Sequence, residues 1–282
     1  MRLTRKQTIL VLCVAALLFG FTLFQASWLA DKPTGKPKLV ADHAAEPVRD
    51  AAGCVASANS GYGGAMVGPD IAALQVAAGS GASAVRVTTH LTDGVLRVAP
   101  QFESDCATDK VRQPARIADA VSGMTKPELF WQVEGVEQAT LLLAELTDMP
   151  GALERSFILG DDVAVDIIRK SPRDIRAFSI DKARACAADY RLSGLWGRVP
   201  ETCKNGTMLL TLDDVGFTLW GWPNRFLARM KSANVQIIIA EDVVDGQIKG
   251  LTNVDQYGDI ANSYNGYIWV NNIEELGPAL RR

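Results

Sequence analysis

The stretch that decides the fold is GSGASAVRVTTHLTDGVLRVAP, residues 79–100. Within it, the β-rich runs AVRVTT (84–89) and VLRV (95–98) are both typical of strands. The turn between them is centred on Thr92-Asp93-Gly94, whereas a parallel crossover needs a dozen or more residues. The two runs must therefore form a hairpin or a bent pair, and together they fill one position in a sheet.

The rest of the chain alternates β-rich runs with helix-like segments. The strand candidates are 54–58, 84–89, 95–98, 129–133, 155–159, 175–180, 207–212, 235–240 and 267–270. Helix candidates lie between most of them, at 70–79, 114–122, 136–147, 162–170, 181–188, 222–232, 253–263 and 273–281. This alternation indicates βα units and a parallel sheet. Counting the hairpin once leaves eight strands, which predicts a (β/α)8 TIM barrel, a fold of about 250 residues.

Composition narrows the classes of function. The 282 residues carry 29 Lys+Arg against 32 Asp+Glu, for a net charge of −3, and 48% are hydrophobic. This is a globular composition with an ample core. The charge balance argues against a nucleic-acid partner, which favours a basic stripe. Two His and no C-x-x-C spacing argue against a structural zinc site.

The N-terminus is predicted to be a membrane anchor or a signal segment over residues 1–30. A basic start precedes an apolar run at 9–24, which is longer than a secretory core of about 7–15 residues and shorter than a spanning helix of about 20. Ala26-Ser27-Trp28 is a poor cleavage site, which favours the uncleaved anchor. We expect a single-pass protein of a bacterial inner membrane with its C-terminal domain in the periplasm, or a secreted one if the segment is cleaved.

Residues 31–52 contain three prolines and no apolar periodicity, which predicts a linker, with the barrel domain at 53–282. His43 then is a solvated linker residue. Export permits disulfides among the four Cys that follow the anchor. Cys186 and Cys203 bracket a Gly- and Pro-containing excursion and are the favoured pair. Cys54–Cys106 follows by elimination, and buried free thiols are the alternative for both pairs.

In a TIM barrel, chemistry lies at the carboxyl ends of the strands. The residues at the predicted ends are Asn59, Thr88, His90, Pro100, Gln132, Glu134, Asp161, Asp162, Asp213, Asp214, Glu241, Asp242, Asn271 and Asn272. The acidic residues that follow strands are ordinary helix N-caps and first-turn residues. If two of the acidic pairs converge, they would instead form a Mg²⁺ or Ca²⁺ site.

Residues 79–100 resemble the glycerophosphodiester phosphodiesterase family, part of the phospholipase C-like phosphodiesterase superfamily of TIM barrels. Gly81-Ala82, Leu91-Thr92 and Asp93-Gly94-Val95 keep the skeleton of that family's G-A-D-x-I-E-x-D-V-x-L-T-x-D-G-x-x-V pattern. The remainder of 53–282 is similar in order and spacing, ending with GYIWVNN (266–272) before a last helix. The resemblance implies hydrolysis of phosphodiesters by two His and a divalent metal.

The family's functional positions are nearly all substituted in this chain. Its first catalytic His, its phosphate-contacting Arg and its second catalytic His fall on Asn59, Ser60 and Pro100. Its metal-ligand positions fall on Gly68, Arg86, Thr88 and Gln132. Arg86 places a positive charge where a cation would sit, at a cost of roughly 4 kcal/mol per unit charge at about 4 Å. With His43 in a linker, only His90 remains in the barrel, so a two-His mechanism cannot operate.

Four residues are candidates for binding a ligand: Arg86, His90, Glu134 and Trp222. Arg86 could hold an anion, or form an internal salt bridge with Glu134 or another acid in the pocket. His90 could contact a ligand or stabilise its turn. Trp222, with Trp196 and Trp220 in the same half of the chain, could stack on a polyol, sit on lipid headgroups, or pack in the core.

The sequence therefore favours a membrane-tethered, catalytically inactive phosphodiesterase-like barrel outside the cytoplasm. It would bind an anionic or polyol ligand, or an envelope protein, and would need no cofactor unless a metal site is relocated. The alternative is an active phosphoric diester hydrolase of lipid or glycerophosphodiester metabolism with a rebuilt site. A purely structural module of an envelope assembly is a third hypothesis.

Overall fold

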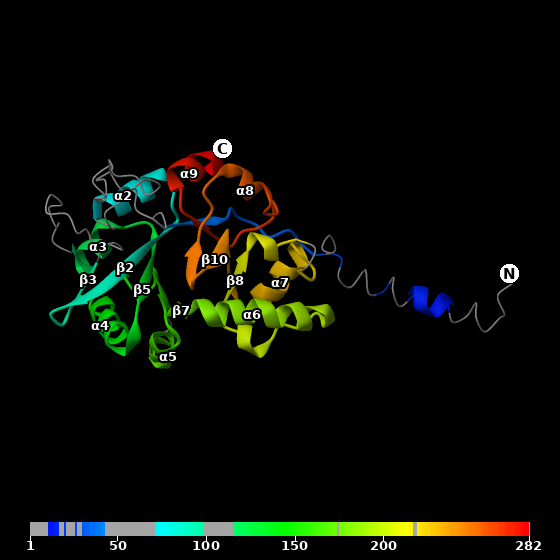
Figure 1. The fold of residues 1–282 in the computed structure, drawn as a ribbon, viewed down its shortest axis with the longest axis horizontal. Helices are drawn as coiled ribbons and strands as arrows, with labels where there is room; N and C mark the ends of the chain where they lie inside the picture. Colours follow the sequence, from blue (N-terminus) through cyan, green and yellow to red (C-terminus); the bar gives the residue numbers. More distant parts are fainter. Residues whose placement is uncertain are drawn as a thin grey trace.

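The computed structural model describes residues 11–16, 20, 26, 30–42, 71–98, 115–173, 175–216 and 219–281 (Figure 1). Among these residues, no helix has both the length and the apolar character needed to cross a membrane. Most of the N-terminal apolar run lies outside them, so the anchor stays a prediction.

Eight parallel strands form a nearly closed barrel, which confirms the predicted fold class. They are β1 (Lys38–Ala41), β2 (Ala84–Thr92), β5 (Glu128–Val133), β6 (Ser156–Gly160), β7 (Arg176–Phe178), β8 (Thr207–Thr211), β9 (Gln236–Ala240) and β12 (Tyr267–Val270). Their order is β7-β6-β5-β2-β1-β12-β9-β8. The ends of this path, β7 and β8, are consecutive along the chain, as the closing pair of a TIM barrel would be.

The predicted hairpin is present. β3 (Val95–Val98) pairs antiparallel with β2, with Thr89 opposite Val98 and Thr92 opposite Val95. Asp93 and Gly94 form the turn with φ of 51° and 72°, the left-handed region that a tight two-residue hairpin turn requires. A short strand, β4 (Ala115–Arg116), pairs antiparallel with β3, and a separate hairpin joins β10 (Asp242–Val244) to β11 (Gln247–Lys249). The second hairpin was not predicted from the sequence.

Helices cover the outside of the barrel (Figure 1). They are α2 (Ile71–Ser80), α3 (Ile117–Gly123), α4 (Gly135–Thr147), α5 (Asp162–Lys170), α6 (Ile180–Ser193), α7 (Asn224–Ser232), α8 (Val254–Gly258) and α9 (Ile273–Arg281). Each matches a predicted helix, although α8 is shorter than the expected 253–263 because Asp259 follows it as its C-cap. The larger hydrophobic core lies between this layer and the strands.

The inside of the barrel is filled by aromatic side chains. Phe130 stacks on Phe157 with ring centroids 4.6 Å apart, and Trp269 meets Phe130 edge-on at 5.7 Å. Phe178 closes the group with an edge contact to Phe157 at 5.4 Å. The lumen is therefore a packed core and not an open channel.

The first strand corrects the predicted boundaries. β1 occupies 38–41, inside the segment expected to be a linker, and it pairs with both β2 and β12. The barrel therefore begins before residue 53. The candidate strand at 54–58 and the candidate pair Cys54–Cys106 lie outside the described residues. The Cys186–Cys203 disulfide is confirmed, with 5.0 Å between the two Cα atoms.

A polar network closes the amino ends of the strands. Glu128 accepts hydrogen bonds from Tyr267 Oη at 2.7 Å, Arg176 Nη1 at 3.2 Å and Lys38 Nζ at 3.3 Å. Each of these residues begins its strand, so the network joins β1, β5, β7 and β12. Burial alone would raise the pKa of Glu128, but the Tyr267 hydrogen bond and the two cations outweigh it and lower that pKa.

We expect Glu128 to make the fold acid-sensitive. A carboxyl whose pKa is lowered by folding adds stability above its unfolded pKa, and this is lost as pH falls through the folded pKa. Between the folded and unfolded pKa values of Glu128, the unfolding free energy rises with pH. Glu128→Gln should lower the slope of this dependence by up to about 1.4 kcal/mol per pH unit. Urea unfolding between pH 6 and pH 3 measures the slope. An identical slope in the variant would show that Glu128 does not bind the proton.

The disulfide should stabilise the domain by restricting the unfolded chain. Its two cysteines are 17 positions apart, a loop for which closure is worth about 3 kcal/mol. The double variant Cys186→Ser/Cys203→Ser should lose about that much unfolding free energy in denaturant titrations. Cys13→Ser, at an exposed free thiol, is the control and should change nothing. Equal stability of the double variant and the control would contradict the prediction.

Candidate binding site at the barrel mouth

A buried ion pair lies between the carboxyl end of β1 and the third residue of β2, a region that we call the barrel mouth. Asp42 directly follows β1, and the register that sets Ala41 opposite Val85 brings it level with Arg86 in β2. Arg86 Nη1 lies 3.0 Å and 2.8 Å from the two oxygens of Asp42. The side chains are only 5% and 1% exposed, so little solvent screens this pair.

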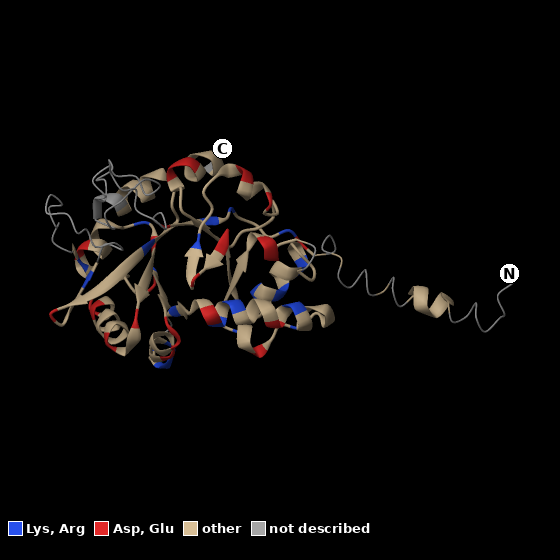
Figure 2. Ribbon diagram, viewed as in Figure 1, with Lys and Arg blue, Asp and Glu red and all other residues tan. Residues whose placement is uncertain are grey.

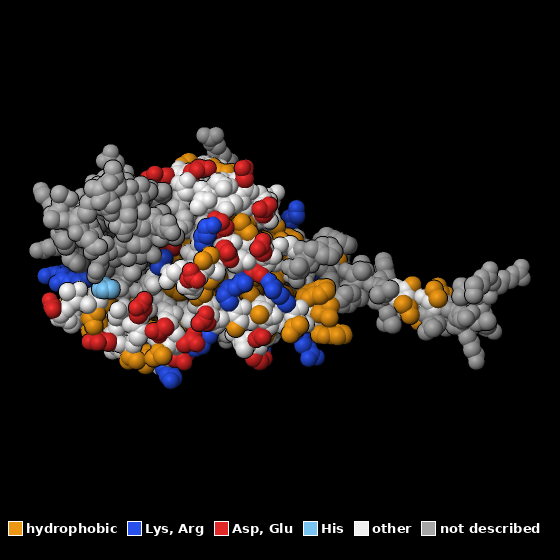
Figure 3. Space-filling model, viewed as in Figure 1, with side chains coloured by type: hydrophobic (Ala, Val, Ile, Leu, Met, Phe, Trp, Pro, Cys, Tyr) orange, Lys and Arg blue, Asp and Glu red, His pale blue; other side chains and the backbone are white. Residues whose placement is uncertain are grey.

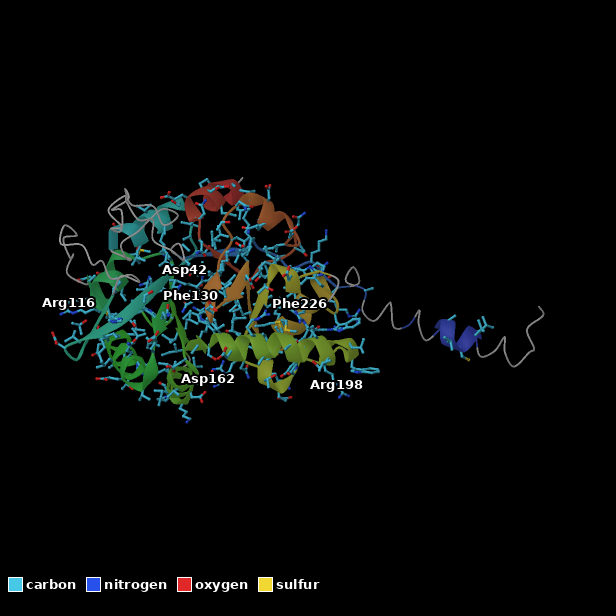
Figure 4. All side chains as sticks on the ribbon, viewed as in Figure 1. Asp42, Arg116, Phe130, Asp162, Arg198 and Phe226 are labelled. Carbon is cyan, nitrogen blue, oxygen red and sulfur yellow. A yellow bond between two sulfur atoms is a disulfide. The ribbon has the colours of Figure 1, made fainter. Side chains whose placement is uncertain are left out.

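Two neighbours complete the hydrogen bonding of the pair. Arg86 Nε donates to Gln132 Oε1 at 2.8 Å, and Arg86 Nη2 contacts the same oxygen. Trp269 Nε1 donates to Asp42 Oδ2 at 2.7 Å. The cluster thus joins β1, β2, β5 and β12, and Figure 4 shows Asp42 near Phe130 of the barrel core.

Arg86 therefore forms an internal salt bridge, as one of the two interpretations of this residue required. The partner is Asp42 and not Glu134, which is exposed at the start of α4 and whose backbone N–H donates to Gln138 Oε1 at 3.1 Å. The anion-binding interpretation of Arg86 is weakened, because Asp42 already neutralises the guanidinium charge.

Thr88, Thr89 and His90 follow in β2 and differ in burial and hydrogen bonding. Thr88 Oγ1 is buried and has no hydrogen-bond partner among the described residues. Thr89, on the opposite side of the strand, donates to the backbone oxygen of Gln132 at 2.7 Å. His90 is exposed and lies opposite Arg97 in the hairpin.

The acidic residues at the strand ends have structural roles. Asp161 caps α5 by accepting from the Ala164 N–H at 2.7 Å, which confirms the capping interpretation there. Asp162 accepts from Ser179 Oγ, and Glu241 pairs with Lys249 at 2.5 Å. No group of three His, Cys, Asp or Glu that could hold a metal ion is found in the described part of the chain.

Asp214 shows how strongly such a carboxylate is held. It accepts from the Thr211 N–H at 2.8 Å and pairs with Arg184 and Arg191. Burial would raise the pKa of Asp214, but the Thr211 hydrogen bond and the two arginines outweigh it and lower that pKa. This carboxylate links the end of β8 to α6, and its two arginines leave no role for a metal in neutralising it.

The position of β1 changes which residues of this chain align with the H-R-G motif that the resembled family carries at the end of its first strand. Because that strand ends at Ala41, the H-R-G motif falls on Asp42-His43-Ala44 and not on Asn59-Ser60-Gly61. The resemblance would then place its first catalytic His at Asp42, a residue that the sequence alone assigned to a linker. His43 lies outside the described residues, as do Asn59, Ser60, Gly68 and Pro100.

Trp222 lies in the outer layer, away from the mouth. Its ring is 5.6 Å from Phe226 of α7 and 6.1 Å from Tyr264. Tyr264 Oη in turn donates to the backbone oxygens of Ile237 and Tyr267, near the amino ends of β9 and β12. This placement favours the core-packing interpretation of Trp222 over ligand binding.

Solved structures share this fold. A glycerophosphoryl diester phosphodiesterase domain of an uncharacterised Mycobacterium tuberculosis protein aligns with a TM-score of 0.57 at 13% identity, over 87% of this chain and 98% of that one. A glycerophosphodiester phosphodiesterase from Agrobacterium tumefaciens str. C58 aligns with a TM-score of 0.56 at 13% identity, over 87% and 99%. No protein-family model matches the chain, and a search of curated proteins finds no match. The resemblance seen in the sequence is confirmed at the level of fold.

Removing the charge of Arg86 should destabilise the barrel, because Asp42 would be left as an uncompensated buried charge. Breaking a buried pair in this way costs about 3–5 kcal/mol, so Arg86→Met should lose that much unfolding free energy. Arg86→Met/Asp42→Asn should recover much of the loss, since the charge is gone and Trp269 keeps an acceptor. Chemical denaturation compares these variants with Lys170→Met, an exposed control at the end of α5. If Arg86→Met were as stable as Lys170→Met, the buried Asp42–Arg86 ion pair would not contribute to stability as proposed.

Proposed function

We propose that the chain is a membrane-tethered, phosphodiesterase-like barrel that binds a ligand or partner outside the cytoplasm and does not hydrolyse phosphodiesters. The observation that carries the proposal is the Asp42–Arg86 pair, which occupies the mouth of the barrel and is satisfied by its own neighbours. The tether is the apolar run at 9–24.

The side chains at the mouth are poor acid–base catalysts. A general acid or base needs a pKa near the working pH and a path to the substrate. Asp42 is a carboxylate bound to a guanidinium and an indole N–H, so its proton-accepting oxygens are already engaged. The phosphodiesterase resemblance would place a catalytic His at this position.

The metal that the family resemblance implies also does not fit the residues present. The positions of the second-strand metal ligands hold Arg86 and Thr88, and the position on β5 holds Gln132. The Arg86 guanidinium repels a divalent cation. Gln132 Oε1 already accepts a hydrogen bond from Arg86 Nε. We therefore derive no step through a metal.

The kind of ligand can be narrowed. Neutralisation of Arg86 by Asp42 removes the main electrostatic attraction for an anion at the mouth. Thr88 Oγ1 remains as a buried hydroxyl that has no partner among the described residues, and it can both donate and accept. These two features favour a polyol hydroxyl over a phosphate.

An active hydrolase with a rebuilt site is the second candidate. The feature that favours it is His43, which directly follows Asp42 at the end of the first strand. Histidine is the side chain that most often transfers protons near neutral pH.

Hydrolysis assays separate the two candidates. We expect the purified full chain to give no turnover of glycerophosphodiesters or bis-p-nitrophenyl phosphate above the buffer rate, with Mg²⁺, Ca²⁺ or Mn²⁺ and across pH 5–9. An active family member measured in parallel shows that the assay works. Metal-dependent turnover that disappears in both Asp42→Asn and His43→Gln would establish the rebuilt enzyme instead.

A further inference from the structure

The loop closed by the Cys186–Cys203 disulfide displays two large apolar side chains to solvent. Leu192 is 79% exposed and Trp196 is 70% exposed, the highest fractions among the large hydrophobic residues that the structure describes. Arg198 follows on the same loop and is also exposed. We call Leu192, Trp196 and Arg198 the loop patch.

The loop is held in this conformation from several sides. α6 ends at Ser193 and continues into the short 3-10 helix Gly194–Trp196, closed by Gly197 at a φ of 70°. Trp220 Nε1 donates to the backbone oxygen of Arg191 at 2.8 Å. Thr202 Oγ1 donates to Asp189 at 2.8 Å. These contacts hold in place the segment that carries Leu192 and Trp196, which makes its two exposed apolar side chains a candidate interaction surface.

The chain that follows the N-terminal apolar run lies at the same end of the domain. Ala30, with Arg225, Ala228, Arg229 and Ser232 of α7, lines a cleft of about 400 Å³. Arg229 Nη1 also donates to Tyr190 Oη at 3.1 Å and to the Gly194 backbone oxygen at 3.4 Å, which joins α7 to the start of the 3-10 helix.

The figures show the same arrangement. In Figure 1 the chain leaves toward the N-terminus beside α7 and the C-terminal end of α6. Figure 3 shows hydrophobic side chains gathered at that end, and Figure 4 places Arg198 there.

The charge at this end is positive. α7 carries Arg225, Arg229 and Lys231 and no acidic residue, and Figure 2 shows basic residues on this part of the ribbon. Arg198 forms no ion pair with any described residue. Of the nearby acids, Glu201 pairs with Lys204 at 2.5 Å, whereas Asp189 accepts from the neutral hydroxyl of Thr202.

We propose that the loop patch docks the barrel on the surface of the membrane that holds its N-terminal segment, with anionic lipid headgroups as its ligand. Trp196 would sit at the headgroup level, Leu192 would enter the acyl boundary, and Arg198 would contact phosphates. This proposal rests on the membrane tether of the proposed function, which supplies the lipid surface beside the patch. It is independent of whether the mouth is catalytic.

Lipid quenching of tryptophan fluorescence tests the docking and the tether separately. The full chain is reconstituted in phosphatidylcholine/phosphatidylglycerol vesicles with brominated acyl chains. Trp196 reports the patch as the quenching that Trp28→Phe shows and Trp28→Phe/Trp196→Phe loses, because half-buried Trp220 and Trp222 remain in both variants and Trp131 and Trp269 are fully buried. In Trp196→Phe, Trp28 reports the N-terminal run. We expect quenching in both variants, and much less in Trp28→Phe/Trp196→Phe.

The outcomes distinguish the two proposals. Quenching in Trp196→Phe but none in Trp28→Phe would overturn the docking and leave the tether intact. Quenching in Trp28→Phe alone would support the docking and overturn the tether. Quenching in neither would overturn both. Persistence of the Trp196 signal in pure phosphatidylcholine would overturn the choice of an anionic lipid and identify a zwitterionic membrane surface as the occupant instead.

A matched pair of substitutions tests the role of Leu192. In the Trp28→Phe background, Leu192→Glu should lower the docked-to-undocked ratio about tenfold, because it replaces an apolar contact by a charge that anionic lipid repels. Val163→Glu makes the same kind of change at an exposed residue of α5 and should leave Trp196 quenching unaltered. Near-ultraviolet circular dichroism shows that both variants keep the native packing. Equal quenching in the two variants would overturn the proposal.

Discussion

The structure depends on the neutralisation of one guanidinium. Arg86 lies beside a barrel interior of aromatic and aliphatic side chains, where an unpaired charge would be strongly destabilising. Asp42 supplies the counter-charge, and Gln132 and Trp269 occupy the remaining hydrogen-bonding positions. A carboxylate that must neutralise an arginine is no longer available to a metal. The Asp42–Arg86 pair therefore fixes the end of β1 against β2.

The sequence predicted the elements whose signal is local. The β2–β3 hairpin follows from a turn too short for a crossover, and the helices from their length and position between strands. β1 has no such signal, because KLVA is a four-residue run among prolines and polar residues. Its assignment depends on pairing with β2 and with β12, which lies near the other end of the chain. CVASA was an equally plausible choice from composition alone.

The same limit applies to the site. Arg86 was recognised as a cation inside the barrel, yet its partner could not be identified while Asp42 was assigned to a linker. The acidic strand ends posed a similar problem, because a capping carboxylate and a metal ligand look alike in sequence. The structural role of Asp214 follows from its ion pairs with Arg184 and Arg191, which belong to α6. Such partners come from other elements, so only the fold reveals them.

The barrel mouth and the C-terminal end of α6 differ in how many of their charged and apolar side chains already have partners within the domain. At the mouth, positive and negative charge cancel within one cluster, which leaves little field to attract a charged ligand. At the C-terminal end of α6, Arg198 and two apolar side chains face solvent on a loop that a disulfide holds in place. Binding a partner would bury more apolar surface and neutralise more charge at this end of α6 than at the mouth.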